Sequence, residues 1–278
     1  MKFENIHIYN FSGALHGMRN PKNSWDKSDS EWGICTSSQR NDILDKMIAL
    51  YHEAELSMAN QKIISQWRKD YAHDVFIEDN GLGMYLYQII GPNDMKLAQT
   101  LIKAGSEHRK FLRQIIVTVD ITAPLYFFKE FDTYKIGTTA NSTSTMHKLT
   151  SKPITLDCFE IDDYCSKVMN EIETGLNEPA TKTIIDICES LRQKYLETKD
   201  KRYWKELVRW LPESWLQTRT VTMNYENLLA MCSKSQRRFH KLNEWSGRKD
   251  DSLDNFISFA RELPYAADFI FLDEAEQE

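Results

Sequence analysis

The stretch APLYFFKEFDTYKIGTTANSTSTMHK, residues 123–148, decides which fold the sequence predicts. Pro124 suits the first turn of a helix, and the apolar residues after it recur at helical spacing, so we expect an amphipathic helix over residues 124–135. After Gly137 the sequence turns to Thr, Ser and Asn, which carry more hydrogen-bonding groups than a turn needs. This pattern favours a loop that holds a polar ligand, although such clusters are usually plain loops and helix caps.

Working outward from this stretch, the sequence predicts two strands and two further long helices. Residues 115–119 alternate in polarity and run directly into the expected helix, and residues 218–223 alternate in the same way. Apolar residues at helical spacing predict helices over 93–105 and 180–210. The predicted fold class is therefore α+β, a few-stranded sheet that contains both strands and is packed by the helices at 93–105, 124–135 and 180–210.

The remaining elements follow from local patterns. We expect a first strand over residues 6–10, then a long loop over 13–33 from which Arg19, Asn20, Ser24 and Trp25 could reach a site. Further helices are expected at 41–59, 161–175 and 253–263, with a helix followed by a strand over 61–87. Residues 1–272 should form a single domain, and residues 273–278 a disordered acidic tail.

Composition narrows the class of protein. No apolar run among the 278 residues approaches the roughly 20 residues needed to cross a bilayer, so we expect a soluble protein without a membrane partner. The start MKFENIHIYNFSG lacks the pattern of a secretory signal, and five cysteines without CxxC spacing argue against a disulfide scaffold and against a metal site. These features predict a cytoplasmic location. A net charge of −6 disfavours binding to a nucleic acid polymer but allows a small basic pocket for one phosphorylated ligand.

The stretch at 123–148 resembles the signature of the flavin-dependent thymidylate synthases, or thymidylate synthase complementing proteins, in the manner of a divergent phage or bacterial-type member. In that family an Ala-Pro opens a helix that ends in Arg-Gln-Trp-Phe-Arg-His-Arg, and Ser-x-Asn-Glu-x-Ser-x-Arg-Tyr follows a short link. Aligned on Ala123-Pro124, this chain has Lys129-Glu130 at the family's Arg-Gln, Thr133-Tyr134-Lys135 at its Arg-His-Arg, and Thr139, Asn141 and Ser144 at its Ser, Asn and second Ser. Ser142 stands at the family's Glu, and Met146-His147 at its Arg-Tyr.

A second block resembles the same family nearer the C-terminus. The family has a Leu-Pro, a strand, an Asn that starts a helix, a later Arg, and a Trp-Glu or Glu-Trp; this chain has Leu211-Pro212, Asn224, Arg237 and Glu244-Trp245. Glu226 and Ala230 replace an Arg and an Asn that the family uses on the flavin. The segment SEHRKFLRQ, residues 106–114, lies between the helix expected at 93–105 and the strand expected at 115–119. In it, His108 and Phe111 match a histidine and a phenylalanine of the family. A basic cluster of this kind is otherwise typical of a solvated face.

The resemblance implies a flavin-dependent thymidylate synthase-like fold and an enzyme that transfers a one-carbon unit from methylenetetrahydrofolate to C5 of dUMP. It implies FAD as cofactor, NADPH as reductant, and a homotetramer with sites between its subunits. Two alternatives remain: a pyrimidine nucleotide hydroxymethylase, and a non-enzymatic nucleotide-binding or interaction protein on the same scaffold.

The resemblance also implies roles for individual residues. Arg237 is the candidate for the pyrimidine contact, because a guanidinium can hold a developing oxyanion with two parallel hydrogen bonds, and Arg238 is the alternative to it. The catalytic candidates are Arg237 and Ser144; the substrate-binding candidates are Glu130, Ser144, Arg209 and Arg237; the cofactor-binding candidates are His108, Lys135, Asn141 and Asn224. Each also has a plain structural interpretation, since Ser144 and Asn224 suit helix caps, Asn141 can satisfy a loop backbone, and Arg209 suits a surface.

Overall fold

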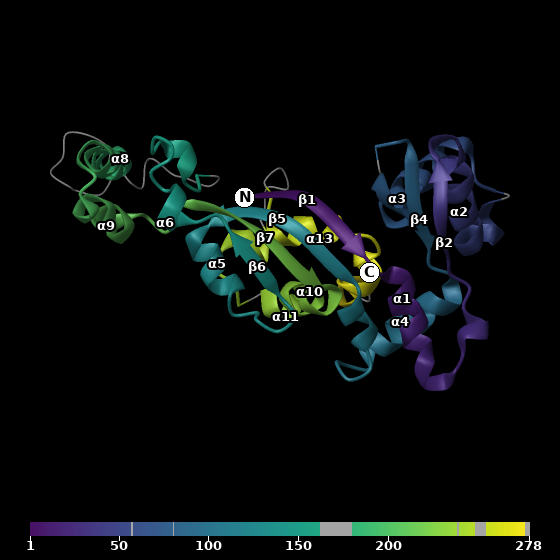
Figure 1. Ribbon diagram of the computed structural model, residues 1–278. Helices are drawn as coiled ribbons and strands as arrows, with labels where there is room; N and C mark the ends of the chain where they lie inside the picture. Colours follow the sequence, from purple (N-terminus) through teal and green to yellow (C-terminus); the bar gives the residue numbers. More distant parts are fainter. Residues whose placement is uncertain (57, 80, 162–179, 238, 248–253, 276–278) are drawn as a thin grey trace.

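The computed structural model describes the chain apart from residues 57, 80, 162–179, 238, 248–253 and 276–278. The fold is α+β, as predicted. In the described part of the chain the strands form a four-stranded and a three-stranded sheet, both antiparallel. Figure 1 shows an elongated molecule with the four-stranded sheet in the middle, a pair of helices at one end and the three-stranded sheet at the other.

The larger sheet has the strand order β1 (Lys2–Tyr9), β5 (Ile116–Pro124), β7 (Leu216–Asn224) and β6 (Thr139–Ser142). The two central strands pair along their whole length, from Ile116 opposite Asn224 to Pro124 opposite Leu216. This confirms that the two predicted strands lie in one sheet. In β5 the fully buried Val117, Val119 and Ile121 alternate with partly exposed residues, because successive side chains of a strand point to opposite faces.

Helices close the apolar side of this sheet. They are α5 (Leu125–Phe131), α10 (Tyr225–Cys232), α12 (Asn243–Ser246), α13 (Phe256–Arg261) and α14 (Ala266–Phe269), with α1 (Phe11–Arg19), α4 (Pro92–Lys103) and the short 3-10 helix η4 (Lys110–Gln114) at one side. The centre of this packing is aromatic: the rings of Phe127 and Trp245 stack with centroids 4.5 Å apart, and both are buried together with Phe128 and Phe131. Burial of a large aromatic side chain contributes roughly 1.5–3 kcal/mol, so α5 is anchored mainly by its phenylalanines.

The helix expected at 124–135 is shorter than predicted. Pro124 belongs to β5, with φ −67° and ψ 155°, because it pairs with Leu216 of β7, and the helix ends at Phe131. Beyond it, Gly137 takes φ +82°, a left-handed conformation that favours glycine.

Residues 13–33 are not the long loop that the sequence predicted. They form most of α1, the short 3-10 helices η1 (Asn20–Lys22) and η2 (Trp25–Lys27), and the start of β2 (Glu31–Thr36). The buried residues of α1 follow helical spacing, but Gly13 and Gly17 lower the helix propensity of the segment. A Cβ at Gly17 would lie 2.7 Å from Oε1 of Gln114, so the end of this flexible side chain would have to move.

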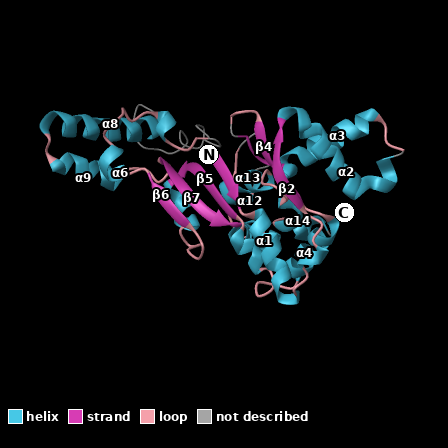
Figure 2. Ribbon diagram, turned by 45° about the vertical axis from the view of Figure 1, so that its right-hand side comes forward, coloured by secondary structure: helices cyan, strands magenta, loops and turns pink. Residues whose placement is uncertain are grey.

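The three-stranded sheet has the order β2, β4 (Met84–Ile89) and β3 (Phe76–Asp79), and η3 (Ser37–Gln39) leads from β2 into the helices. Figure 2 shows α2 (Arg40–Leu56) and α3 (Gln61–Val75) beside it. The predicted helix at 41–59 is confirmed with an earlier end, and so is the helix followed by a strand over 61–87. None of the described helices is long and apolar enough to cross a membrane.

The predicted helix at 180–210 is two helices, α8 (Ala180–Thr198) and α9 (Lys201–Trp210), and they do not pack on the larger sheet. The break is at Lys199, whose φ is +56°, and Asp200 then caps α9 by accepting a hydrogen bond from the Arg202 amide at 2.9 Å. The arm formed by α8 and α9 has its own small hydrophobic cluster: Leu149, Ile154, Phe159, Cys188 and Leu207. Figure 1 shows the arm beyond the end of the sheet, next to α6 (Thr145–Lys148). The packing expected for 180–210 is therefore wrong.

The ends of several predictions change as well. Most of the helix expected at 161–175 lies outside the described residues, and the helix expected at 253–263 is described from Phe256 as α13. The disorder expected for the acidic tail is wrong for residues 273–275, because they belong to α15 (Leu272–Ala275) and Glu274 pairs with Arg261 at 2.6 Å. The single domain over residues 1–272 stays a prediction.

Two acidic side chains lie where α3 meets α14, and they make the fold sensitive to pH. Asp74 accepts a hydrogen bond from the Tyr265 amide at 2.5 Å, and Asp268 accepts one from Gln99 at 2.9 Å. Burial, followed by repulsion from Asp74, raises the pKa of Asp268 from 3.8 to about 6. Since the pKa is raised in the folded state, the stability that Asp268 contributes is complete below its unfolded pKa and is lost as pH rises through 6.

We therefore expect Asp268→Asn to stabilise the fold above pH 6 and to leave it unchanged near pH 4. The gain should be about 1–3 kcal/mol at pH 8, because the amide keeps the acceptor for Gln99 and removes the buried charge. Thermal melts of both proteins between pH 4 and pH 8 measure it. The exposed Asp26→Asn is the control, and an Asp268→Asn gain that is the same at every pH would contradict this account.

Candidate functional site

The structure brings the two sequence blocks together at the end of α5. Gln236 donates a hydrogen bond from Nε2 to the Tyr134 hydroxyl at 3.1 Å, and Nε2 of His240 lies 3.3 Å from the same hydroxyl. On the other side of its ring, Nδ1 of His240 lies 3.8 Å from Oε1 of Glu130. We call Glu130, Tyr134, Gln236, His240 and Trp245 the Tyr134 cluster. It joins residues more than 100 positions apart in the chain.

The imidazole of His240 is held in a half-apolar place. Its side chain is 7% exposed, and its ring stacks on Trp245 with centroids 5.0 Å apart and planes at 19°. Burial lowers the pKa of His240, and the Glu130 carboxylate opposes this shift. Burial also raises the pKa of the Tyr134 phenol, so this hydroxyl stays protonated at neutral pH. A neutral imidazole between a carboxylate and a phenol can accept or pass on a proton.

Trp245 adds a polar group without a use in the fold. Its Nε1 is buried and has no hydrogen-bond partner among the described residues. Buried donors are normally paired, and the described residues supply no acceptor for this one.

Asn224 is a helix cap, the structural alternative that the sequence left open. It ends β7 and starts α10, accepts a hydrogen bond from the Asn227 amide at 2.9 Å, and its own amide donates to Asn227 Oδ1 at 3.1 Å. Asn227 also donates to the carbonyl of Ile136 at 2.6 Å. A Cβ on Gly137 would lie 2.8 Å from Nδ2 of Asn224, so only glycine lets the segment after α5 approach α10 this closely.

The segment expected to be a ligand-holding loop is partly an edge strand. Residues 139–142 form β6, with Asn141 exposed and opposite Thr220. The prediction of a loop throughout is wrong, because the edge of β7 offers backbone groups and threonines suit strands. Ser144 is a cap of α6, whose side chain accepts a hydrogen bond from the His147 amide at 3.2 Å.

The other predicted residues lie in different surroundings. Lys135 is exposed after α5. Arg209 lies on α9 and forms an ion pair with Glu206, and no contact joins it to the Tyr134 cluster in the described part of the chain. Arg237 is the last residue of α11 (Lys234–Arg237), next to Gln236, but its side chain is outside what the structure describes. Arg238 lies outside the described residues altogether.

His108 is exposed in the turn after α4, where it lines a cavity of about 1070 Å³. Its neighbour Arg109 donates from Nε to both carboxylate oxygens of Glu226, at 2.9 and 3.1 Å. Glu226 thus lies in the first turn of α10 as one half of an ion pair. His108 therefore lies near the start of α10, since the next residue, Arg109, is paired with Glu226. No contact joins His108 to the Tyr134 cluster in the described part of the chain.

Sequence reasoning gave no role to Gln236, His240 or Tyr134. A signal was present, since Tyr134 stands at the histidine of the family's Arg-His-Arg, and Gln236 and His240 flank Arg237 before Glu244-Trp245. Which of them face one another depends on the path of the chain, and spacing does not reveal that path.

Three of the four predicted cofactor-binding residues offer hydrogen-bond donors of the kind that FAD needs. Within the described part of the chain, the side chains of His108, Lys135 and Asn141 make no hydrogen bond or ion pair, so their donors are free for an anionic or polar cofactor. Asn224 differs from these three, because its side-chain Oδ1 already accepts the hydrogen bond of the cap. Of the three described cavities, the one beside α1 and α4 is lined by His108, and none is lined by Lys135 or Asn141.

Among known proteins, the chain is similar to solved structures only. No protein-family model matches the chain, and no curated protein matches it. A structure of the flavin-dependent thymidylate synthase ThyX from Helicobacter pylori with FAD and dUMP is similar at 14% identity and a TM-score of 0.45, covering 87% of this chain and 96% of that one. A second structure of ThyX from Helicobacter pylori with FAD and dUMP gives 14% identity and a TM-score of 0.46, covering 88% and 98%. At this identity the likeness concerns chain arrangement and assigns no ligand or activity to this protein.

Proposed function

We propose that this protein is a divergent FAD-dependent thymidylate synthase-like enzyme that transfers a one-carbon unit from methylenetetrahydrofolate to C5 of dUMP. The single observation that carries the proposal is the meeting of the two motif blocks, with Tyr134 of the first block against Gln236 and His240 of the second. Two segments that resemble one family in order and spacing are expected to meet if they build one site. We further propose a cytoplasmic homotetramer with NADPH as the reductant.

The nucleotide is proposed to bind beside the Tyr134 cluster. The Gln236 amide and the Tyr134 hydroxyl can hydrogen-bond a pyrimidine edge, and Arg237, the residue after Gln236, is proposed to stabilise the negative charge that develops as C5 becomes nucleophilic. Glu130 and His240 are proposed to hold or move the proton that leaves C5, because Nδ1 of His240 lies 3.8 Å from Glu130 and Nε2 lies 3.3 Å from the Tyr134 hydroxyl. Ser144 and Arg209 are proposed to contact the phosphate of a nucleotide bound to another copy, since neither contacts this cluster within one chain.

The proposed flavin contacts are His108, Lys135 and Asn141, with Asn224 holding the start of α10 in place. Once bound and reduced by NADPH, the flavin would supply the hydride that converts the transferred methylene to a methyl group. A purified protein with bound flavin supports this part of the proposal, and one that stays colourless with added FAD contradicts it.

One observation favours a second candidate, a nucleotide-binding protein without catalysis. Glu226 lies where the family places an arginine on the flavin, and it is fully engaged with Arg109. A carboxylate at that place disfavours the pyrophosphate of FAD, and the ion pair cancels a positive charge that could have attracted it. Nucleotide binding without release of the C5 hydrogen would favour this candidate.

We expect dUMP to raise the melting temperature of the protein. A ligand at 100 times its dissociation constant stabilises the native state by about 2.7 kcal/mol, and free uridine should protect less because it lacks the phosphate. Differential scanning fluorimetry with dUMP, uridine and inorganic phosphate measures the difference. Equal shifts for dUMP and uridine would contradict a phosphate contact, and no shift with any of them would contradict nucleotide binding.

A further inference from the structure

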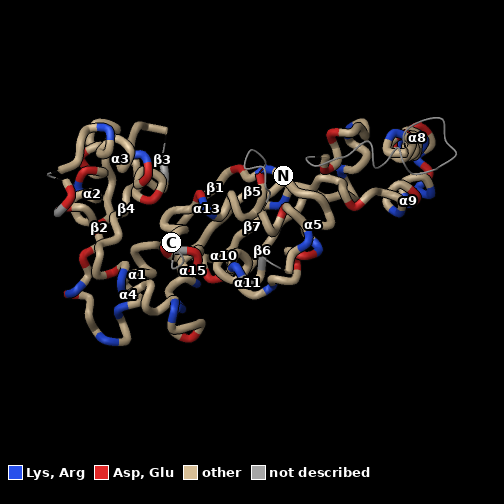
Figure 3. The backbone as a smooth tube through the Cα atoms, turned by 180° about the vertical axis from the view of Figure 1, so that it is seen from behind, with Lys and Arg blue, Asp and Glu red and all other residues tan. Residues whose placement is uncertain are grey.

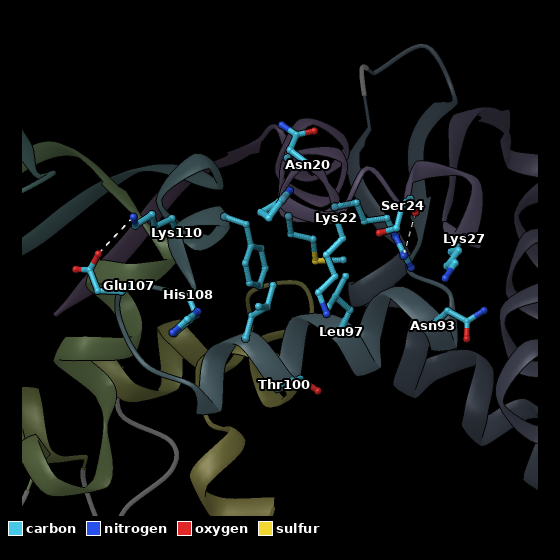
Figure 4. A pocket seen from close by; sticks show the side chains of 16 residues that line it. Asn20, Lys22, Ser24, Lys27, Asn93, Leu97, Thr100, Glu107, His108 and Lys110 are labelled. Carbon is cyan, nitrogen blue, oxygen red and sulfur yellow. Dashed lines mark hydrogen bonds and ion pairs between the residues drawn. The ribbon is translucent and has the colours of Figure 1, made fainter.

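The cavity beside α1 and α4 is a second place where a ligand fits. Its volume is about 1070 Å³, within reach of cofactor-sized molecules. One wall is the segment from the end of α1 through η1 to η2, and the other is α4 and the turn that follows it. Figure 4 shows the side chains of Lys22, Lys27 and His108 around it, with Leu97 and Thr100 on α4.

The first wall of the cavity is fixed to α4 by buried polar contacts. Arg19 donates from Nε to Asp94 at 2.5 Å, and Ser28 and Ser30 each donate to the other carboxylate oxygen of Asp94 at 2.6 Å. Asp29 accepts from the backbone amide of Asp94 at 3.1 Å. Because these contacts already exist without a ligand, binding does not have to order this wall, which lowers the entropic cost of binding.

The rim of the cavity is positive. Lys22 and Lys27 are exposed and make no ion pair in the described part of the chain, whereas Lys110 is paired with Glu107 at 3.3 Å. Figure 3 shows further Lys and Arg positions in the loops around α1 and α4, although the whole chain carries a net charge of −6. Free cations gathered at one cavity of an acidic protein favour an anionic ligand.

The floor of the cavity is apolar. Leu97 and Leu101 line it from α4, and Phe111 lines it from η4. A free phosphate would contact only the charged rim and leave these apolar side chains exposed to water. A ligand with a flat apolar ring would also bury them.

We propose that this cavity binds a nucleotide, with its phosphates on Lys22 and Lys27 and its base on Leu97, Leu101 and Phe111. This site goes beyond the proposed function: it lies apart from the Tyr134 cluster, and it does not need flavin to be held at Lys135 and Asn141. The lysines supply mobile point charges to a phosphate chain, and the apolar floor accepts the face of a base without reading its identity.

The test is isothermal titration of the full-length protein with ADP, adenosine and pyrophosphate. We expect ADP to bind most tightly, and Lys22→Ala/Lys27→Ala to weaken ADP binding by about 10- to 100-fold, because two charge-assisted contacts are lost. The matched control is Lys96→Ala, an exposed lysine on α4 that does not line the cavity, which should bind ADP like the wild type. ADP affinity should also fall as salt is raised.

Three other outcomes would contradict the proposal. Equal ADP affinity of the wild type and Lys22→Ala/Lys27→Ala would contradict the proposed phosphate contacts. Pyrophosphate binding as tight as that of ADP would contradict the proposed contact with the base. A Tyr134→Phe/His240→Gln variant should keep ADP affinity and lose only dUMP-dependent effects, so failure of the proposed function is distinguishable. Loss of bound flavin together with ADP in Lys22→Ala/Lys27→Ala would show one shared site and overturn a separate one.

Discussion

Arg237→Lys is expected to lower turnover of dUMP by about 10- to 1000-fold. Lysine keeps the positive charge but loses the two parallel hydrogen bonds with which a guanidinium holds an oxyanion. If Arg237 meets charge that appears only as C5 becomes nucleophilic, the loss falls on the chemical step, and flavin content should change little. The measurement is release of tritium from dUMP labelled at C5, with FAD, NADPH and methylenetetrahydrofolate supplied.

Arg238→Lys is the matched control, since it makes the same change one residue later. Loss of tritium release in Arg238→Lys with normal release in Arg237→Lys would move the role to Arg238. No release from the wild-type protein under these conditions would contradict the enzyme and favour the nucleotide-binding protein. Formation of 5-hydroxymethyl-dUMP in place of dTMP would favour the pyrimidine nucleotide hydroxymethylase.

The central strands were predictable because their signal is local. In β5 and β7 apolar residues alternate with threonines, and the same alternation places one face on the core. The aromatic helix after Pro124 was predictable for the same reason, apart from its ends. Those ends depend on β7, which pairs with Pro124 and keeps it extended.

Other elements could not be predicted because their cause lies far away in the sequence. Thr139 to Ser142 resemble a loop, yet they pair with an edge of β7 about 80 residues later, and β-sheet formation at an edge needs only a free partner strand. In α1, glycine at position 17 weakens the helical pattern, and the helix depends on the packing of its buried residues against α4 and η4. The break between α8 and α9 rests on Lys199, a residue with no turn preference.

The candidate site was predictable only in part. The sequence blocks indicated which segments meet, and Tyr134, Gln236 and His240 show that they do meet. The cap roles of Asn224 and Ser144 could not be separated from ligand roles beforehand, since the same side-chain oxygen serves an amide of the helix or a ligand. The cavity at Lys22 and His108 requires α1 and the segment after it, and the glycines and asparagines there are typical of a loop.

Asp94→Ala is expected to destabilise the protein by about 3–5 kcal/mol. Asp94 is fully buried, and it is the acceptor for Arg19, Ser28 and Ser30. Its removal leaves the guanidinium of Arg19, whose side chain is 5% exposed, as a buried charge without its carboxylate. Urea unfolding followed by circular dichroism measures the change in the free energy of unfolding.

Two further variants separate the buried pair from a general effect of charge. Lys194→Ala breaks the exposed pair with Glu197 and should change stability by less than about 1 kcal/mol. Arg19→Met/Asp94→Leu removes both charges and should recover most of the loss, because an apolar replacement leaves no buried charge unpaired. If Asp94→Ala is within about 1 kcal/mol of the wild type, the wall beside α4 is not held by this pair. ADP affinity should then be insensitive to it, whereas a wall that depends on Asp94 should lose ADP binding in Asp94→Ala and regain it in the double variant.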